Sequence, residues 1–341
     1  MNALLPLWHP ESGSGPTLSV VVPVYNEKDV LPLLIGRLET VLMAMDLPYE
    51  ILFVDDGSRD GSAELLNQFC QSHAGVSVVY LSRNFGKEAA VTAGLEQARG
   101  DAVILIDADL QDPPELIPAM VEAWRDGVDV VCMRRRTRAG ESWLKRTSAS
   151  LFYRLLNHVS RFEIPPDTGD FRLMSRRALN ALHQLPERNR YMKGLFAWIG
   201  MPTRVLFYDR APRAAGQSKW PWLGLLGLAF EGITSFSTAP LRWLTGVGGM
   251  AALWGAMFGV WIVLKALLHG DPVPGYPSLV ALISFFGGIQ LLTVGLVGEY
   301  VGKTYLEVKQ RPVYLIREIA HSHQTAAFAP LAEHHDAIQN S

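Results

Sequence analysis

Two carboxylates and a carboxamide follow one apolar segment of the sequence at even spacing. The stretch ILIDADLQDPPE spans residues 104–115 and contains Asp107, Asp109 and Gln111. In an extended segment, residues two apart face the same way, so the side chains of Asp107 and Asp109 can converge. Carboxylate and amide oxygens are ligands of hard cations such as Mg²⁺ and Mn²⁺, which share a substrate's phosphates. The spacing therefore indicates a divalent metal that neutralises charge on a phosphate leaving group.

An acidic turn that caps a helix is the alternative interpretation of this stretch. Asp112 directly precedes Pro113 and Pro114, and Pro is favoured in the first turn of a helix. We expect Asp112 to cap that helix, and Asp107 and Asp109 to bind the metal.

Segments of strand type alternate with segments of helical spacing in the surrounding chain. Strands are expected at 17–27, 49–62, 76–82, 101–111 and 128–136. Helices are expected between them, at 28–45, 63–73, 87–99 and 114–127. This alternation predicts an α/β fold with a doubly wound, mostly parallel sheet and right-handed crossovers.

Polar clusters end four of these strands. They are Pro23–Glu27, Asp55–Ser58, Arg83–Phe85 and Asp107–Gln111. Ligands of open parallel sheets bind at the carboxyl ends of the strands, so four clusters at one edge predict a single site. The sequence has neither a glycine-rich dinucleotide fingerprint after its first strand nor a phosphate loop with Gly-Lys-Ser/Thr. A bound nucleotide would therefore depend on carboxylates and a metal.

Two apolar segments near the C-terminus are each long enough to cross a membrane. Residues 245–268 carry a single charge, Lys265, and residues 277–298 carry none. About 20 apolar residues span a hydrocarbon core of about 30 Å, and core helices of soluble proteins rarely carry so few charges over two full spans. A short Pro/Gly turn separates the segments, which predicts a transmembrane hairpin.

The basic residues around the hairpin predict its orientation. Arg242 precedes the first span, Lys303, Lys309 and Arg311 follow the second, and the loop 269–276 has no Lys or Arg. The positive-inside rule places both chain ends in the cytoplasm. We therefore expect a multi-pass membrane protein.

Residues 220–244 are apolar but interrupted by Glu231, several Ser/Thr residues and Pro240. Helices lying in the membrane interface fit this composition. A re-entrant or third spanning helix is the alternative.

Composition excludes several other classes. The net charge of −2 gives no reason to expect a nucleic acid partner. Cys70 and Cys132 each lie in an apolar stretch, as reduced buried thiols do. The N-terminus lacks the basic and apolar segments of a signal peptide. The C-terminal histidines, from His321 to His335, form no metal pattern in what we expect to be a disordered polar tail.

Several motifs together resemble glycosyltransferase family 2, which has the GT-A fold. They are VVPVYNE, FVDDGSRDGS, RNFGKEAAVTAGL, DADLQDPPE and GDFRLMSRRAL. With RAAGQSKW at 213–220 and two C-terminal spans, the chain is similar over residues 17–310 to the polyprenyl-phosphate glycosyltransferase branch. The implied organisation is an N-terminal tail (1–16), a GT-A catalytic domain (17–219), interfacial helices (220–244), the hairpin (245–298) and a C-terminal segment and tail (299–341).

The resemblance implies roles for residues around the nucleotide sugar. The metal and diphosphate motif corresponds to Asp107, Asp109 and Gln111. The positions that line the nucleotide pocket correspond to Pro23, Tyr25, Glu27 and Asp55, with Asp56 on the ribose side. Asp170 corresponds to a carboxylate near the sugar and the acceptor and, with Asp109, is the implied catalytic pair.

The resemblance also implies positions that contact a lipid phosphate, namely Arg135, Arg213, Ser218 and Lys219. Arg134 and Arg136 flank Arg135 and are alternatives to it. Arginine suits phosphate because its guanidinium donates two parallel hydrogen bonds. A patch that faces anionic lipids is the other interpretation of this basic run.

The implied reaction moves one sugar from a nucleotide sugar, with UDP-glucose as first expectation, to undecaprenyl phosphate, with inversion at the anomeric carbon. A phosphate monoester has a second pKa of about 6, so its oxygen is a nucleophile at pH 7 without a strong general base. The resemblance implies Mg²⁺ or Mn²⁺ as cofactor and a homo-oligomer, with a tetramer as first expectation. It also implies a place in the bacterial inner (cytoplasmic) membrane, with both chain ends and the catalytic domain on the cytoplasmic side.

Other functions are compatible with parts of this pattern. A mannosyltransferase that uses GDP-mannose differs only in its donor. An inactive, membrane-anchored protein that binds nucleotide sugars would keep the fold but not the chemistry, and the intact acidic motif disfavours it. A processive synthase would need more spans and a Gln-x-x-Arg-Trp motif, which the sequence lacks. A flippase-like transporter would also need more than two spans in each chain.

Overall fold

The structure is a computed structural model, and it describes residues 17–136, 168–188, 190–209, 239–269 and 275–322. The predicted lipid-phosphate residues Arg213, Ser218 and Lys219 lie outside these ranges. So do most of the predicted interfacial segment and the predicted tail 1–16.

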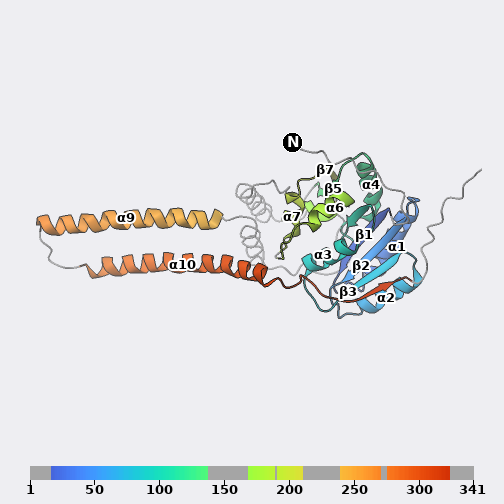
Figure 1. Cartoon of the computed structure of the whole chain (residues 1–341), viewed down its shortest axis with the longest axis horizontal. Helices are drawn as coiled ribbons and strands as arrows, with labels where there is room; N and C mark the ends of the chain where they lie inside the picture. The colour runs from blue at the N-terminus through green and yellow to red at the C-terminus, as the bar shows by residue number, and fades with distance from the viewer. Residues whose placement is uncertain (1–16, 137–167, 189, 210–238, 270–274, 323–341) are drawn as a thin grey trace, which may run out of the picture.

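One mixed sheet of eight strands organises the described part of the catalytic domain (Figure 1). Its strands lie in the order β7-β5-β6-β4-β1-β2-β3-β8. In chain order they are β1 (Leu18–Val24), β2 (Tyr49–Asp55), β3 (Val76–Leu81), β4 (Ala102–Leu105), β5 (Val130–Arg135), β6 (Thr168–Ser175), β7 (Thr203–Tyr208) and β8 (Ile316–His321).

The central pairings of the sheet are parallel, as the sequence predicts. β1 pairs in parallel with β2 and β4, β2 with β3, and β5 with β7. Three pairings are antiparallel, because β6 is inserted between β4 and β5 and β8 is added beside β3. The sequence pattern did not predict β6, β7 or β8 as strands.

Helices cover both faces of the sheet, which confirms the doubly wound arrangement. One face packs against α1 (Leu31–Met43), α2 (Ser62–Ser72) and α4 (Ile117–Arg125), with the short 3₁₀ helix η1 (Pro114–Leu116) before α4. The other face packs against α3 (Lys87–Gln97), α6 (Arg176–His183) and α7 (Met192–Trp198). Cys70 and Cys132 are buried free thiols, one in each core, as predicted.

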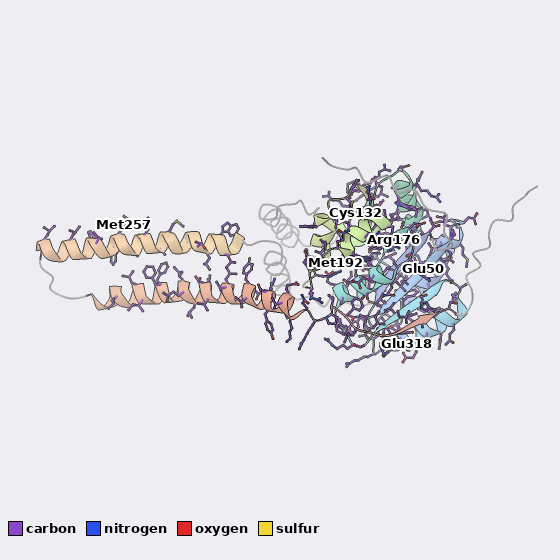
Figure 2. The ribbon with its side chains drawn as sticks, viewed as in Figure 1. Glu50, Cys132, Arg176, Met192, Met257 and Glu318 are labelled. Atoms are coloured by element: carbon purple, nitrogen blue, oxygen red, sulfur yellow. The ribbon has the colours of Figure 1, made fainter. Side chains whose placement is uncertain are left out.

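Two long antiparallel helices project from this domain (Figure 1). They are α9 (Ala239–His269) and α10 (Tyr276–Lys309), which include both predicted spans. By length and composition, Trp243–Trp261 and Phe285–Lys309 can cross a membrane, and no part of these windows is buried in the protein. Met257 on α9, labelled in Figure 2, is exposed, as are many other apolar side chains of the two helices. Exposed apolar surface on this scale indicates association with a membrane rather than a soluble core.

The helical hairpin is joined to both edges of the sheet. The chain leaves the sheet after β7, at one edge, and returns to it as β8, at the opposite edge. His321 was expected in a disordered tail, but it is the last residue of β8, and its Nδ1 lies 3.2 Å from Ser77 Oγ. The expectation was wrong because β8 completes its hydrogen bonds with β3, which is distant in sequence.

A glycine sets how closely α3 approaches the sheet. A Cβ atom at Gly94 would lie 2.3 Å from Val21 Cγ1 and 3.0 Å from Val54 Cγ2, and both valines are fully buried. Only a residue without a side chain allows this contact. The position of α3 matters because its first residue, Lys87, lies in the pocket described below.

We expect Gly94→Ala to lower the free energy of unfolding by about 1–3 kcal/mol, the usual cost of overpacking a filled core. Thermal unfolding of the purified protein in detergent measures this as a lower midpoint. Gly36→Ala is the matched control, because a Cβ atom there has no neighbour within 4 Å and alanine favours a helix by up to about 1 kcal/mol. Equal midpoints for wild type and Gly94→Ala would contradict the close packing.

Candidate active site

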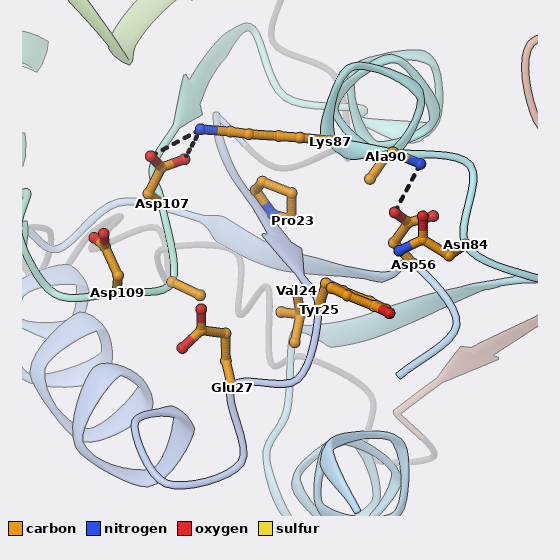
Figure 3. Close-up of a pocket in the computed structure, with 12 residues that line it drawn as sticks. Pro23, Val24, Tyr25, Glu27, Asp56, Asn84, Lys87, Ala90, Asp107 and Asp109 are labelled. Carbon is orange, nitrogen blue, oxygen red and sulfur yellow. Dashed lines mark hydrogen bonds and ion pairs between the residues drawn. The ribbon is translucent and has the colours of Figure 1, made fainter. Parts of the chain in front are cut away.

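A pocket of about 390 Å³ lies at the carboxyl ends of the central strands. Four of the polar clusters that the sequence places at this edge contribute to it (Figure 3). Of the predicted site residues, it brings together Pro23, Tyr25, Glu27, Asp56, Asp107 and Asp109. Asn84, from the predicted cluster Arg83–Phe85, also lines it, and the sequence reasoning missed Lys87.

The acidic motif forms a turn rather than a continuation of the strand. β4 ends at Leu105, and Leu110 has a left-handed φ of 57°. Asp109 Oδ1 accepts a hydrogen bond from the backbone N–H of Gln111 at 3.1 Å. Figure 3 shows the carboxylates of Asp107, Asp109 and Glu27 along one side of the pocket.

Gln111 and Asp112 differ from their expected places. Gln111 is only 9% exposed and does not line the pocket, so its role as a metal ligand stays a prediction. Asp112 was expected to cap the following helix, but its carboxylate accepts a hydrogen bond from the Tyr208 hydroxyl. The N-cap of η1 is Pro113, which has no side-chain capping bond.

Lys87 connects the acidic turn to Asp170. Its Nζ lies 2.7 and 2.8 Å from the two carboxylate oxygens of Asp107 and 2.6 Å from Asp170 Oδ2. The antiparallel pairing of β4 and β6 explains why these carboxylates lie close together. The pairing ends at Leu105 and Arg172, and Asp107 and Asp170 each lie two residues beyond that pair, at the same end of the two strands. The ammonium thus separates two carboxylates that would otherwise repel.

The charges around Asp170 keep it ionised. Burial alone would raise its pKa, but Lys87 and then Lys193 outweigh burial and hold the pKa at about 2. Burial would likewise lower the pKa of Lys87, but Asp107 and Asp170 raise it above its usual value. Arg172 is buried below this pair, donates to the carbonyl of Gly169 at 2.9 Å and stacks on Phe196. The backbone that carries Asp170 is therefore fixed.

Asp56 holds the loop that forms the opposite wall. Its two carboxylate oxygens accept the backbone N–H groups of Phe85 at 2.7 Å and Gly86 at 2.9 Å. Burial raises the pKa of Asp56, and these two hydrogen bonds partly oppose the rise. A Cβ atom at Gly57, whose φ is 71°, would lie 2.8 Å from the backbone of Arg83, so this turn and loop are in direct contact.

The remaining predicted nucleotide residues occupy two environments. Tyr25 lines the pocket and is 46% exposed. Asp55 is buried and does not line the pocket, and its Oδ1 accepts the backbone N–H of Ser58 at 3.2 Å. The role of Asp55 at the nucleobase stays a prediction.

The three arginines at the end of β5 have different surroundings. Arg134 lies over the Phe207 ring, 5.8 Å from its centroid, and Arg136 is exposed. Arg135 is half-buried beside Tyr208, and its buried Nε has no hydrogen-bond partner. Burial and Asp112 raise the pKa of Tyr208, and Arg135 opposes this rise. Arg135 is therefore the arginine that retains an unsatisfied buried donor.

The donor set of the pocket fits a hard divalent cation. Asp107 and Asp109 present carboxylates from one turn, and Asp107 Oδ1 is buried without a hydrogen bond of good geometry, although it contacts the Lys87 ammonium. Among the described residues, no cluster of three or more His, Cys, Asp or Glu forms a complete metal cage. Two carboxylates leave coordination positions for water and phosphate, as Mg²⁺ and Mn²⁺ require.

Glu88, next to Lys87, provides a pH-dependent contact with α7. Its carboxylate accepts the backbone N–H of Met192 at 3.3 Å, and burial, followed by repulsion from Asp170, raises its pKa to about 7. The usual value of 4.5 applies to the unfolded chain, so wild-type stability falls as pH rises from 4.5 to about 7. Each pKa unit corresponds to about 1.4 kcal/mol.

We therefore expect Glu88→Gln, which stays neutral, to melt close to wild type at pH 5 and several degrees higher at pH 8. The gain in free energy of unfolding cannot exceed about 3.5 kcal/mol, given the size of the pKa rise. Thermal unfolding measured across this pH range tests the prediction. Melting curves that shift in parallel with pH in both proteins would contradict it.

Comparisons with known proteins identify the family of this chain. Residues 19–182 match the family model described as glycosyl transferase family 2. An uncharacterized glycosyltransferase of Synechocystis sp. is 48% identical over 302 residues, covering 89% of this chain and 95% of that protein. The SfII prophage-derived bactoprenol glucosyl transferase of Shigella flexneri is 45% identical over 301 residues, covering 88% and 97%.

Among solved structures, glucosyl-3-phosphoglycerate synthase from Mycobacterium tuberculosis, in complex with Mn²⁺, UDP-glucose and phosphoglyceric acid, is similar with a TM-score of 0.47 and 22% identity. It covers 68% of this chain and 86% of that one. The curated relatives cover the hairpin as well as the catalytic domain, and they extend the family match beyond residue 182. The chain therefore belongs to glycosyl transferase family 2.

Proposed function

We propose that this protein transfers glucose from UDP-glucose to a polyprenyl phosphate at the cytoplasmic face of the membrane, with inversion at the anomeric carbon. One observation carries the proposal: the acidic pocket and an apolar helical hairpin belong to the same chain. A lipid-linked acceptor cannot leave the bilayer, so an enzyme that uses it must bring its pocket to the interface. Relatives named bactoprenol glucosyl transferase match along this whole arrangement.

The donor side of the pocket is assigned to the acidic turn and the β1 end. Asp107 and Asp109 would hold a divalent cation, which supplies charge neutralisation at the leaving nucleoside diphosphate. Tyr25 offers a face for the base, and Asp56 orients the loop that carries Asn84. Pro23 and Glu27 complete this wall.

Asp170 is assigned to charge stabilisation and orientation rather than to proton transfer. With a pKa of about 2, it is a poor proton acceptor at neutral pH. The acceptor phosphate needs no base, because its second pKa of about 6 leaves it ionised at pH 7. A fixed carboxylate near the sugar can orient hydroxyl groups and stabilise positive charge that develops on the ring.

The acceptor side is assigned to Arg135 together with Arg213, Ser218 and Lys219. Arg135 has a buried N–H without a partner at the end of β5, and the other three follow β7 in the sequence. The proposed topology is a multi-pass protein of the inner membrane with both chain ends in the cytoplasm, since basic residues flank the hairpin only at its open end. A homotetramer is the proposed assembly.

A GDP-mannose donor is the second candidate function, because carboxylates at strand ends do not distinguish nucleobases. One assay distinguishes these candidate functions. Membranes that contain the protein are incubated with labelled UDP-glucose or GDP-mannose, Mg²⁺ or Mn²⁺, and undecaprenyl phosphate. A glucosylated monosaccharide lipid is the expected product. A mannosyl lipid would indicate the mannosyltransferase, and a polymer would indicate a processive synthase. Donor binding without turnover would indicate an inactive binding protein.

Asp109→Asn is expected to reduce sugar transfer by about 10²–10³-fold or more, because it removes a charged ligand of the cation that would neutralise the leaving diphosphate. Folding should be retained, since asparagine keeps an oxygen that can accept the Gln111 N–H. Transfer rates and thermal midpoints of the purified protein measure the two effects. Wild-type activity of this variant in the presence of a chelator would exclude the metal role.

Arg135→Ala is expected to raise the KM for polyprenyl phosphate about tenfold, the usual effect of losing a charged hydrogen bond, with little change in the KM for the donor. Arg134→Ala and Arg136→Ala are matched controls that remove the same charge from the adjacent positions. A larger acceptor effect in either control would move the phosphate contact to that residue. Thermal unfolding of Arg135→Ala checks that its contact with Tyr208 is not required for folding.

A further inference from the structure

Lys87 lies in the place that a divalent cation would enter, beside the carboxylate of Asp107. Its Nζ contacts both oxygens of Asp107, at 2.7 and 2.8 Å, so it covers the face of the carboxylate that a cation would use. A metal bound to either oxygen there would lie close to the ammonium and would repel it. The metal and the Lys87 ammonium therefore compete for Asp107.

We propose that Lys87 is an internal counter-cation that makes tight metal binding dependent on the diphosphate of the nucleotide. This inference rests on the proposed function, since it assumes that a metal and a nucleoside diphosphate bind in this pocket. Lys87 thereby acts as a positioning residue for the donor, a role that neither the sequence pattern nor the family resemblance assigns to it.

The charges of the pocket wall explain the dependence. Glu27, Asp56, Asp107 and Asp109 contribute carboxylates, and Lys87 is the cation among the residues that line the pocket. A metal that arrives alone must displace the ammonium from Asp107 and gives it no new partner there. A metal that arrives with a diphosphate brings phosphate oxygens that can receive the displaced ammonium. The two ligands then bind with positive coupling, and each raises the affinity of the other by the same factor.

Lys87 has both the freedom to move and a second contact that limits the movement. Its side chain is 46% exposed, whereas those of Asp107 and Asp170 are 22% and 17% exposed. A Cβ atom at the preceding Gly86 would have no neighbour within 4 Å, so the chain is not crowded at this end of α3. When the ammonium leaves Asp107, its contact with Asp170 at 2.6 Å keeps it at the pocket. The displaced Nζ would thus stay between the donor and the acceptor sides.

Binding of Mn²⁺ measures the proposal directly and without turnover. Electron paramagnetic resonance of free Mn²⁺ gives its Kd for the purified full-length protein in detergent at pH 7.5, with and without UDP. For wild type we expect UDP to tighten Mn²⁺ binding at least tenfold. For Lys87→Met we expect Mn²⁺ alone to bind at least tenfold more tightly than to wild type, and UDP to add less than threefold.

Lys193→Met is the matched control. Lys193 also lowers the pKa of Asp170, so its loss removes the same charge from the neighbourhood, but the ion pairs described for Asp107 involve Lys87. We expect its Mn²⁺ affinity without UDP to stay within threefold of wild type. An equal gain of Mn²⁺ affinity in Lys193→Met and Lys87→Met would mean that any nearby positive charge has this effect. That result would overturn the inference.

Other outcomes separate this inference from the proposed function. Unchanged or weaker Mn²⁺ binding to Lys87→Met, in protein that melts like wild type, overturns the counter-cation role and leaves the transferase intact. Lys87→Gln, which keeps a hydrogen-bond donor without the charge, gives the same test should Lys87→Met unfold. A wild-type protein that binds no Mn²⁺ even with UDP overturns the proposed metal site itself.

Discussion

The ion pairs of the Lys87 ammonium with Asp107 and Asp170 are the interaction on which the arrangement of the site depends. Asp107 belongs to the turn after β4, Asp170 to the antiparallel strand β6, and Lys87 to the start of α3. Without the ammonium, the register of β4 and β6 would place two carboxylates face to face at low exposure, at a cost in folding free energy. One side chain thus joins three elements and sets the charge that the pocket presents to its ligands.

The sequence predicts the parallel part of this site better than the antiparallel part. Strands β1 to β4 are apolar runs that end in polar clusters, and parallel strands bring such ends to one edge, so the places of Glu27, Asp56 and Asp107 follow from local pattern. The opposition of Asp107 and Asp170 follows instead from a register between strands about sixty residues apart in sequence, which no local pattern specifies. The sequence did not identify Lys87 as a site residue, because a lysine at the start of an alanine-rich helix is typical of a solvated surface.

Local sequence patterns also predict only part of how the helical hairpin of α9 and α10 is attached. The composition predicts the two long apolar helices. It does not predict that β8, which follows them, pairs with β3, because the two strands are more than two hundred residues apart in the sequence. As a result, the chain connects the hairpin to both edge strands of the sheet, β7 before it and β8 after it. The C-terminal end of α10 also contacts the loop before α7, where the backbone N–H of Arg188 donates to the Glu307 carboxylate at 3.0 Å and Arg188 Nη1 donates to the carbonyl of Arg311 at 2.6 Å. The pocket and the hairpin are thereby linked by covalent and noncovalent contacts.

Electrostatics then constrain the order of events for a lipid phosphate acceptor. The described pocket wall carries more carboxylates than cations, so it repels a phosphate dianion while it lacks a donor and its metal. In the proposed complex, the metal takes the place of the Lys87 ammonium at Asp107, and the ammonium keeps only its contact with Asp170. The net charge of the pocket then changes little, but the acceptor phosphate would meet an ammonium that Asp107 no longer neutralises only after the donor is bound. Asp170 is held ionised and Glu88 is held largely protonated below pH 7, so neither needs to exchange a proton for this to happen. The phosphate nucleophile needs no general base, so the proposed role of these charged side chains is to position the ligands and balance their charges.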